Sequence, residues 1–185
     1  AYLGIVESQI TSETLLESFR VMKSATEEIQ SQIEFTRIYE TIGSQNPQWA
    51  VVESTLSFLH PPDDIRITSD IHGISIYADP MLEKVFFNLL DNSIRHGERV
   101  SEIRVSAQKE GEDLVLIWED NGTGIPDDEK EKIFERGYGK NTGLGMFLVR
   151  EILSLTDITI IENGKPRFGA RFEIRIPRES YRIES

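Results

Sequence analysis

The chain has 185 residues, of which 20 are Lys or Arg and 32 are Asp or Glu, so its formal net charge is −12. Hydrophobic residues make up 38% and charged residues 28%, which is the composition of a folded globular protein and excludes a largely disordered one. The acidic balance argues against nucleic-acid binding, and no apolar run is long enough to span a membrane. The absence of cysteine excludes disulfides, thiolate metal sites and cysteine nucleophiles.

The first third of the chain has the pattern of one long amphipathic helix. From Thr11 onward, apolar residues recur at steps of four and three, Ser12 is placed as an N-cap, and Gly43 stands where a left-handed residue ends a helix. A helix of this length must bury its apolar stripe, either on the chain's own body or in a bundle with a partner subunit, and we expect the bundle. Because the sequence begins at Ala1 without Met, we expect residues 1–10 to be the tail of a preceding helix in a longer protein. The stripe consists of Leu15, Phe19, Met22, Thr26, Ile29 and Ile33.

From Asn46 onward, alternating strand patterns are separated by single helices. Strands are predicted at 65–68, 71–78, 102–109, 113–119, 157–162 and 168–176, and the last four form two hairpins. Helices are predicted at 80–96, 128–134 and 143–155, with a short helix or connection at 49–59. The class is α+β: a two-layer sandwich in which helices cover a mixed, mostly antiparallel sheet, preceded by the long helix.

Four short segments carry the chemistry, and the first is FFNLLDNSIRHG in the predicted helix 80–96. Steps of four and of seven or eight residues place its polar members on one helical face, opposite an apolar face. Neutral amide oxygens on such a face suit a hard cation such as Mg²⁺, although a merely solvated polar face is the alternative. The polar members are Asn88, Asn92, Arg95 and His96.

The second segment follows a strand pattern directly. Asp120 stands at the strand's end, where a carboxylate can point into a cleft, and Gly122 and Gly124 permit close approach to a flat ligand. Read alone, this segment is equally compatible with an ordinary tight turn.

The third and fourth segments surround a glycine-rich stretch. An aromatic residue in Ile133–Gly139 precedes two glycines, which is typical of a hinged flap. Lys140–Met146 then opens a helix, where unpaired backbone N–H groups and the helix dipole favour an anion. Many helices begin with glycine, so this segment alone is weak support for a site.

In this order and spacing, the four segments resemble the nucleotide-binding boxes of the GHKL ATP-binding superfamily, and more narrowly those of sensor histidine kinases. The resemblance implies a partial dimerisation and phosphotransfer hairpin at 1–44, mainly its second helix, and a catalytic ATP-binding domain at 45–185. The boxes correspond to Asn88–Gly97 (N box), Asp120–Ile125 (G1 box), Ile133–Gly137 (F box) and Gly143–Met146 (G2 box).

The resemblance also implies ATP and Mg²⁺ as cofactors and assigns roles to residues. Asn92 matches the Mg²⁺ ligand, assisted by Asn88, and Asp120 matches the acceptor of the adenine amino group. Arg95 faces the phosphates and His96 lines the pocket. Catalysis is expected to involve Asn88, Arg95 and Lys140. Gly122, Gly124 and Ile125 line the base. The lid is expected to be mobile without ATP. The lid and its phosphate-side end contribute Arg136, Lys140, Thr142, Gly143, Leu144, Gly145 and Met146.

One residue favours a kinase over an ATPase. Hydrolysing members of the superfamily have a Glu four residues before the metal-binding Asn, and this chain has Asn88, which cannot serve as a general base. The family's phosphoacceptor is a His on the first bundle helix, whereas His60, His72 and His96 all lie elsewhere. The acceptor is therefore expected upstream of residue 1.

The expected function is presentation of Mg·ATP for transfer to that histidine and relay to a response-regulator aspartate. The expected assembly is a homodimer joined through the helical hairpin, with no nucleic acid and no membrane contact by this chain. The expected location of this chain is the cytoplasm, and both a soluble and a membrane-anchored full-length protein stay open. The alternatives are a GHKL serine/threonine protein kinase and a non-catalytic dimeric scaffold that only binds nucleotide.

Overall fold

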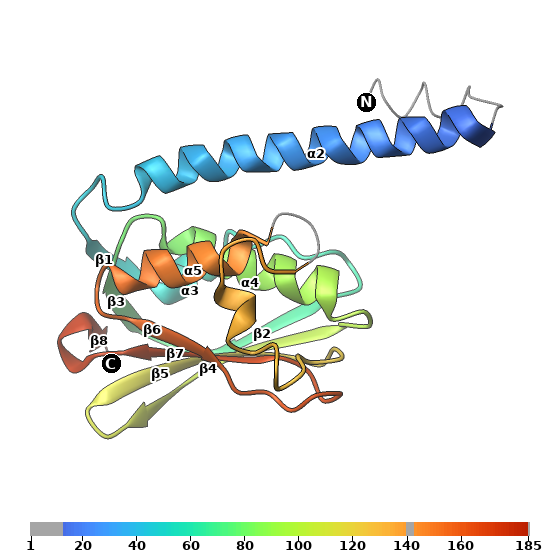
Figure 1. Ribbon diagram of the computed structural model, residues 1–185. Helices are drawn as coiled ribbons and strands as arrows, with labels where there is room; N and C mark the ends of the chain where they lie inside the picture. Colours follow the sequence, from blue (N-terminus) through green and yellow to red (C-terminus); the bar gives the residue numbers. More distant parts are fainter. Residues whose placement is uncertain (1–12, 140–142, 185) are drawn as a thin grey trace. The chain divides into compact units, whose positions relative to one another are not determined.

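The structure is a computed structural model that describes residues 13–139 and 143–184 (Figure 1). The chain divides into two compact units between Glu40 and Thr41. The predicted cap at Ser12 and the preceding helix lie outside the described residues. No helix in the described part of the chain is both long enough and apolar enough to cross a bilayer.

In the described part of the first unit, the chain forms one helix, α2 (Glu13–Thr41), as the stripe of apolar residues predicted. The helix ends as expected, because Gly43 adopts a left-handed backbone with a φ of 70°. Inside the helix, the Thr26 hydroxyl donates to the carbonyl of Met22, which satisfies the one polar member of the stripe. Four apolar members of the stripe are each at least 60% exposed: Leu15, Met22, Ile29 and Ile33.

The second unit contains two sheets. The five-stranded sheet has the order β2-β4-β5-β7-β6, with β2 parallel to β4 and all other neighbours antiparallel. The three-stranded antiparallel sheet has the order β1-β3-β8. The strands are β1 (Gln48–Val51), β2 (Arg66–Asp70), β3 (Ile74–Ala78), β4 (Glu102–Glu110), β5 (Asp113–Asp120), β6 (Thr159–Glu162), β7 (Arg171–Ile176) and β8 (Tyr181–Ile183). The mixed, mostly antiparallel α+β class is thereby confirmed.

Helices α3 (Val52–Leu56), α4 (Leu82–His96) and α5 (Gly145–Ser154) lie over one face of the large sheet (Figure 1). The side chains of β5 alternate, so Leu114, Leu116 and Trp118 enter the core beneath these helices. Phe86 on α4 stacks against Trp118, with ring centroids 6.4 Å apart. This packing holds the end of β5 against α4, so it brings together the two elements on which the sequence places Asp120 and Asn92.

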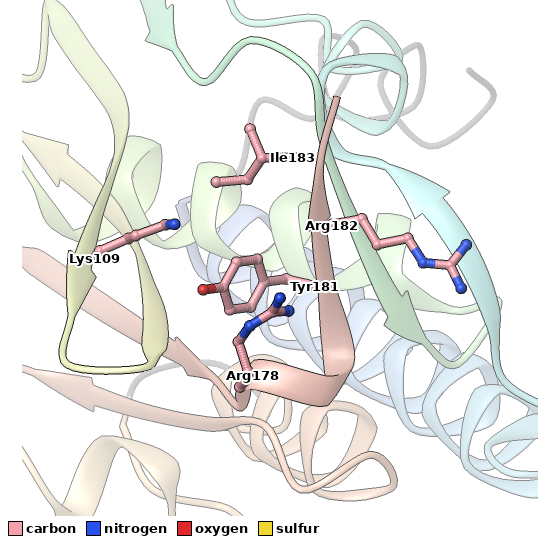
Figure 2. A pocket seen from close by; sticks show the side chains of 5 residues that line it. All are labelled: Lys109, Arg178, Tyr181, Arg182 and Ile183. Atoms are coloured by element: carbon pink, nitrogen blue, oxygen red, sulfur yellow. The ribbon is translucent and has the colours of Figure 1, made fainter. Parts of the chain in front are cut away.

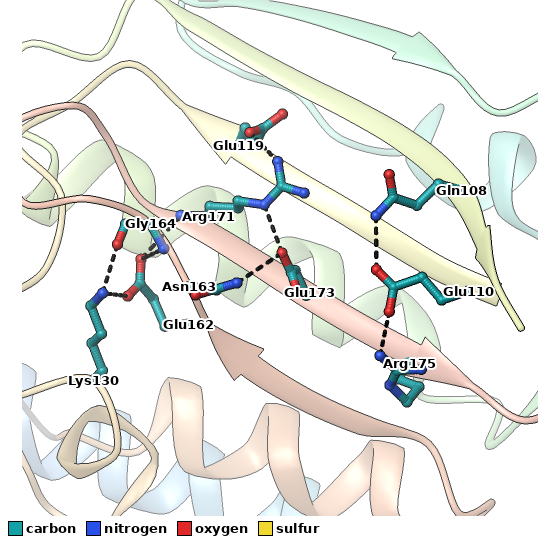
Figure 3. A network of polar contacts seen from close by, with 10 residues as sticks. All are labelled: Gln108, Glu110, Glu119, Lys130, Glu162, Asn163, Gly164, Arg171, Glu173 and Arg175. Carbon is teal, nitrogen blue, oxygen red and sulfur yellow. Dashed lines mark hydrogen bonds and ion pairs between the residues drawn. The ribbon is translucent and has the colours of Figure 1, made fainter. Parts of the chain in front are cut away.

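Charged side chains cover the other face of the large sheet (Figure 3). Arg175 lies beside Val115 in the strand register and forms ion pairs with Glu110 and Asp113. Arg171 lies beside Glu119 and forms ion pairs with Glu119 and Glu173. The aliphatic stems of long charged side chains can cover apolar surface, which accounts for the burial of Val115 on this face.

Several predicted boundaries are corrected by tertiary pairing. The short helix or connection predicted at 49–59 forms a helix only at 52–56, because residues 48–51 all pair with β3 and form β1. The helix predicted from Pro80 begins at Leu82, since Asp79 accepts the N–H groups of Met81 and Leu82 in a preceding turn. The predicted strand 71–78 begins only at Ile74, after a left-handed Gly73.

Two further predictions differ from the structure in the type or existence of an element. The predicted helix 128–134 is a series of turns that ends in the 3₁₀ helix η1 (Lys132–Phe134). The short 3₁₀ helix η2 (Arg178–Ser180) and strand β8 were not predicted, because three-residue elements carry too little periodicity. The helix predicted from 143 begins at Gly145, within the usual spread of helix ends.

Candidate functional site

Asp120 lies at the end of β5, as the sequence predicted, and it is buried. Its Oδ1 accepts the backbone N–H groups of Gly122 and Ala170, both at 3.0 Å. Its Oδ2 accepts the hydroxyl of Ser93 at 2.7 Å. A carboxylate oxygen offers two lone pairs, so Oδ1 is saturated and Oδ2 can accept one more hydrogen bond.

Packing within the protein requires a glycine at position 122, and the predicted close approach of a ligand there stays a prediction. A side chain at Gly122 would lie 2.6 Å from the carbonyl oxygen of Gly97, at the end of α4. Thr123 reinforces this junction, because its backbone N–H donates to the carbonyl of Gly97 and its hydroxyl to that of His96. The loop after Asp120 is therefore fixed to the end of α4.

Gly124 connects the same loop to the β6–β7 connection. Its φ is 70°, and a side chain there would lie 2.8 Å from the carbonyl oxygen of Gly169. The backbone N–H of Arg167 donates to the carbonyl of Thr123, which holds the two segments together. Ile125 follows and is half-buried against the hydrophobic core.

The polar face of α4 is formed as predicted, and its members differ in their partners. Asn88 Nδ2 donates to the carbonyl of Lys84, so its Oδ1 is directed away from its own helix. The Asn92 side chain is half-buried and makes no hydrogen bond among the residues that the structure describes. Arg95 is exposed and forms an ion pair with Asp91 at 2.6 Å. His96 is exposed in the last turn.

Asn88 brings the N box and the G2 box together. A side chain at Gly145 would lie 3.0 Å from Asn88 Oδ1, so the first residue of α5 faces the middle of α4. Among the residues that the structure describes, no side chain caps the start of α5, and the first backbone N–H groups of a helix have no partner within the helix itself. The predicted residues Gly143, Leu144 and Met146 surround this start, with Met146 buried in the core.

The predicted flap has a firmly packed aromatic anchor. Phe134 is buried, contacts Phe172 edge to face and lies under the guanidinium group of Arg150. The backbone N–H of Gly137 donates to the carbonyl of Gly143 at 3.0 Å, which joins the two ends of the glycine-rich stretch. Arg136 is exposed at this joint. The predicted site residues Lys140 and Thr142 lie outside the described residues, so their roles and the mobility of the lid stay predictions.

A buried ion pair connects the start of this segment to β6 (Figure 3). The Glu162 side chain has no exposed surface, and its Oε1 accepts the backbone N–H groups of Gly164 and Arg171. Its Oε2 lies 3.5 Å from Lys130 Nζ, which donates to the carbonyl of Gly164 and to Asp127. Sequence reasoning missed this pair, because Lys130 and Glu162 lie in different segments and match no local pattern.

A separate pocket of about 290 Å³ lies at the C-terminal strand (Figure 2). It is lined by Lys109, Arg178, Tyr181, Arg182 and Ile183, none of which the sequence placed in the site. Tyr181 donates from its hydroxyl to the carbonyl of Glu112, and the Arg182 side chain points away over the ring of Trp49. This pocket thus has no residue in common with the predicted nucleotide site.

Comparison with known proteins gives a consistent result. The family described as "Histidine kinase-, DNA gyrase B-, and HSP90-like ATPase" matches residues 78–180. The chain is 27% identical over 173 residues to the sensor protein KdpD of Escherichia coli K12, covering 85% of this chain and 19% of that protein. It is 37% identical over 101 residues to the alginate biosynthesis sensor protein KinB of Pseudomonas aeruginosa, covering 52% of this chain and 17% of that protein. The chain therefore spans less than a fifth of the length of these two relatives.

Solved structures show the same fold. The histidine kinase AdeS of Acinetobacter baumannii matches with a TM-score of 0.65 at 22% identity, over 96% of this chain and 91% of that chain. Full-length ShkA in complex with AMPPNP matches with a TM-score of 0.70 at 18% identity, over 96% of this chain and 41% of that chain.

Proposed function

The chain belongs to the family of histidine kinase-, DNA gyrase B- and HSP90-like ATPases, and we propose how its residues bind Mg·ATP and where the phosphoryl group goes. It is the ATP-binding catalytic portion of a sensor histidine kinase, as the family and the named relatives agree. The assignment of individual residues, the magnesium ion, the phosphoacceptor and the protein partners form the proposal that follows.

Asp120 binds the adenine. The observation that carries this assignment is the remaining acceptor position on Oδ2, since the other three positions of the carboxylate are occupied by Ser93, Gly122 and Ala170. The 6-amino group of adenine can donate a hydrogen bond to this acceptor position. Ile125 supplies half-buried apolar surface beside the loop, which suits the face of a purine ring.

The phosphates lie between α4 and the start of α5. Asn88 on α4 lies next to Gly145 at the start of α5, where the helix offers N–H groups without partners inside the helix and the positive end of its dipole. The half-buried Asn92, which has no partner among the described residues, is the candidate Mg²⁺ ligand, and Asn88 Oδ1 assists it. When bound, Mg²⁺ neutralises phosphate charge and orients the phosphoryl group for transfer.

The exposed cations of the site complete the phosphate contacts. Arg95 lies on the same face of α4 and, with Lys140 and Arg136 of the lid, stabilises the charge that develops during transfer. Arg95 is paired with Asp91, so it must exchange this partner for a phosphate when nucleotide binds. Thr142 and Gly143 lie at the phosphate-side end of the lid, and His96 with Gly122 and Gly124 completes the wall near the base.

The γ-phosphoryl group passes to a histidine upstream of residue 1. Asn88 stands where a hydrolase of this family has a water-activating Glu, and its amide cannot accept a proton from water. A site that binds ATP without activating water retains the phosphoryl group for another acceptor. The whole protein then transfers it to an aspartate of a response-regulator receiver domain.

Residues 1–44 are part of the dimerisation and phosphotransfer hairpin, and residues 45–185 form the catalytic domain. The exposed apolar stripe of α2 supports this division, because Leu15, Met22, Ile29 and Ile33 repeat with the spacing of a bundle seam. A homodimer joined through this stripe is the expected assembly.

Titration calorimetry with ATP, in the presence and absence of Mg²⁺, tests the proposed site. We expect ATP binding that Mg²⁺ strengthens and that depends on Asp120 for the base and Asn92 for the metal. Equal binding with and without Mg²⁺ would contradict the metal assignment, and no binding in either condition would contradict the nucleotide site.

A further inference from the structure

Ser93 and Trp118 form a buried hydrogen-bond relay behind Asp120. The indole Nε1–H of Trp118 donates to Ser93 Oγ at 3.2 Å, and Ser93 Oγ donates to Asp120 Oδ2 at 2.7 Å. Ser93 and Trp118 are each only 1% exposed. The relay joins α4 to β5 at the carboxylate that the proposed function assigns to the base.

The direction of both hydrogen bonds is fixed by chemistry. An indole N–H can only donate and a carboxylate can only accept, so the Ser93 hydroxyl must receive one bond from Trp118 and give one to Asp120. The two backbone donors, Gly122 and Ala170, hold the other oxygen. Bonds on both oxygens prevent rotation of the carboxylate, so the remaining lone pair of Oδ2 has one direction.

Packing accounts for an aromatic ring at Trp118, but it does not account for the polar N–H group of that ring or for the hydroxyl of Ser93. The ring of Trp118 stacks on Phe86 within the core. A buried hydroxyl costs free energy unless it is bonded, and an alanine at position 93 would leave the buried indole N–H of Trp118 without its acceptor. The indole N–H and the Ser93 hydroxyl satisfy each other, and the hydroxyl in turn donates to Asp120. Of these three residues, Asp120 is the one assigned to the site.

We propose that Ser93 and Trp118 are specificity-determining positioning residues, which orient Asp120 so that the site selects a purine with a 6-amino group. The inference rests on the proposed role of Asp120 in base binding. It adds that selectivity depends on the relay as well as on the carboxylate. Without the relay, Oδ2 loses its fixed direction and the contribution of the amino group to binding decreases.

The test compares ATP with purine riboside triphosphate, which lacks the 6-amino group and keeps the ring, ribose and phosphates. Calorimetry gives the ratio of the two affinities for the parent chain and for Ser93→Ala, Trp118→Phe and Phe86→Leu. We expect the ratio to fall about fivefold in Ser93→Ala, as for the loss of one hydrogen bond, and by a smaller factor, about twofold, in Trp118→Phe, because the Ser93 hydroxyl still donates to Asp120 there. Phe86→Leu is the matched control, because it disturbs the same core contact and removes no hydrogen bond, and it should leave the ratio unchanged.

A purely structural role would weaken the binding of both nucleotides equally and leave the ratio at its parental value. A parental ratio in a folded Ser93→Ala variant therefore overturns the inference. If Ser93→Ala does not fold, Trp118→Phe decides alone, and a parental ratio there overturns it. A parent chain that binds both nucleotides equally instead overturns base reading by Asp120, so failure of the proposed function is distinguished from failure of the relay.

Discussion

Replacing Asp120 by Asn removes the negative charge of the base-binding group and keeps its shape. The amide oxygen can still accept the N–H groups of Gly122 and Ala170, and the amide nitrogen then faces Ser93. The second N–H of that amide replaces the free acceptor position of Oδ2, to which the adenine amino group would donate. Two hydrogen-bond donors then face each other, and no hydrogen bond to the amino group forms. A hydrogen bond to a charged acceptor contributes about 1.5–3 kcal/mol, so we expect ATP affinity to fall roughly 10- to 100-fold.

Calorimetry on the folded variant measures this loss, with thermal unfolding as the control for the fold. Asp120→Ala is a poorer probe, because two buried N–H groups would lose their acceptor at a cost of about 1–3 kcal/mol each. Alanine therefore lowers the free energy of unfolding as well as the affinity. If Asp120→Asn binds ATP as tightly as the parent chain, the reasoning that places adenine at Oδ2 is refuted.

Three further predictions concern the metal, the buried ion pair and the lid anchor. Asn92→Ala should remove the enhancement of ATP binding by Mg²⁺ and leave metal-free binding nearly intact, and equal enhancement in both proteins would exclude Asn92 as a ligand. Lys130→Met should lower the free energy of unfolding by about 3 kcal/mol, because Glu162 loses its cationic partner. The hydrogen bond to Asp127 raises the pKa of Lys130 above its ordinary value, so this difference should persist at neutral pH and shrink as the pH rises through the raised pKa. A difference that stays constant with pH in denaturant titrations would refute this prediction. Phe134→Ala should cost about 3–5 kcal/mol in the same titrations and weaken ATP binding, whereas unchanged stability would show that Phe134 does not anchor the segment.

The site residues that sequence reasoning predicted share a local signal. The polar face of α4 follows from helical periodicity, and Asp120 follows from a strand pattern that ends in a glycine-rich turn. Such signals need only neighbours in sequence, so Asn88, Asn92 and Asp120 could be placed on their elements before the structure was known. Their placement on these elements is confirmed, and their roles stay predictions.

The partners of these residues could not be predicted in the same way. Ser93 lies 27 residues from Asp120 and 25 residues from Trp118, and only the packing of α4 on β5 brings the three together. The close contact of Gly122 with Gly97 is also tertiary, so the sequence predicts a glycine there only through approach to a ligand, and that role stays a prediction. Strand β1 was missed for the same reason, because its pairing with β3 is a tertiary contact that overrides local pattern.

The central claim is that this chain presents ATP to a histidine outside it. The direct measurement incubates the 185-residue chain with γ-labelled ATP and Mg²⁺, alone and with the upstream helical hairpin supplied as a separate polypeptide. The account predicts acid-labile label on the hairpin and none on the chain alone. Stoichiometric labelling of His60, His72 or His96 in the chain alone, or rapid release of free phosphate, would contradict it.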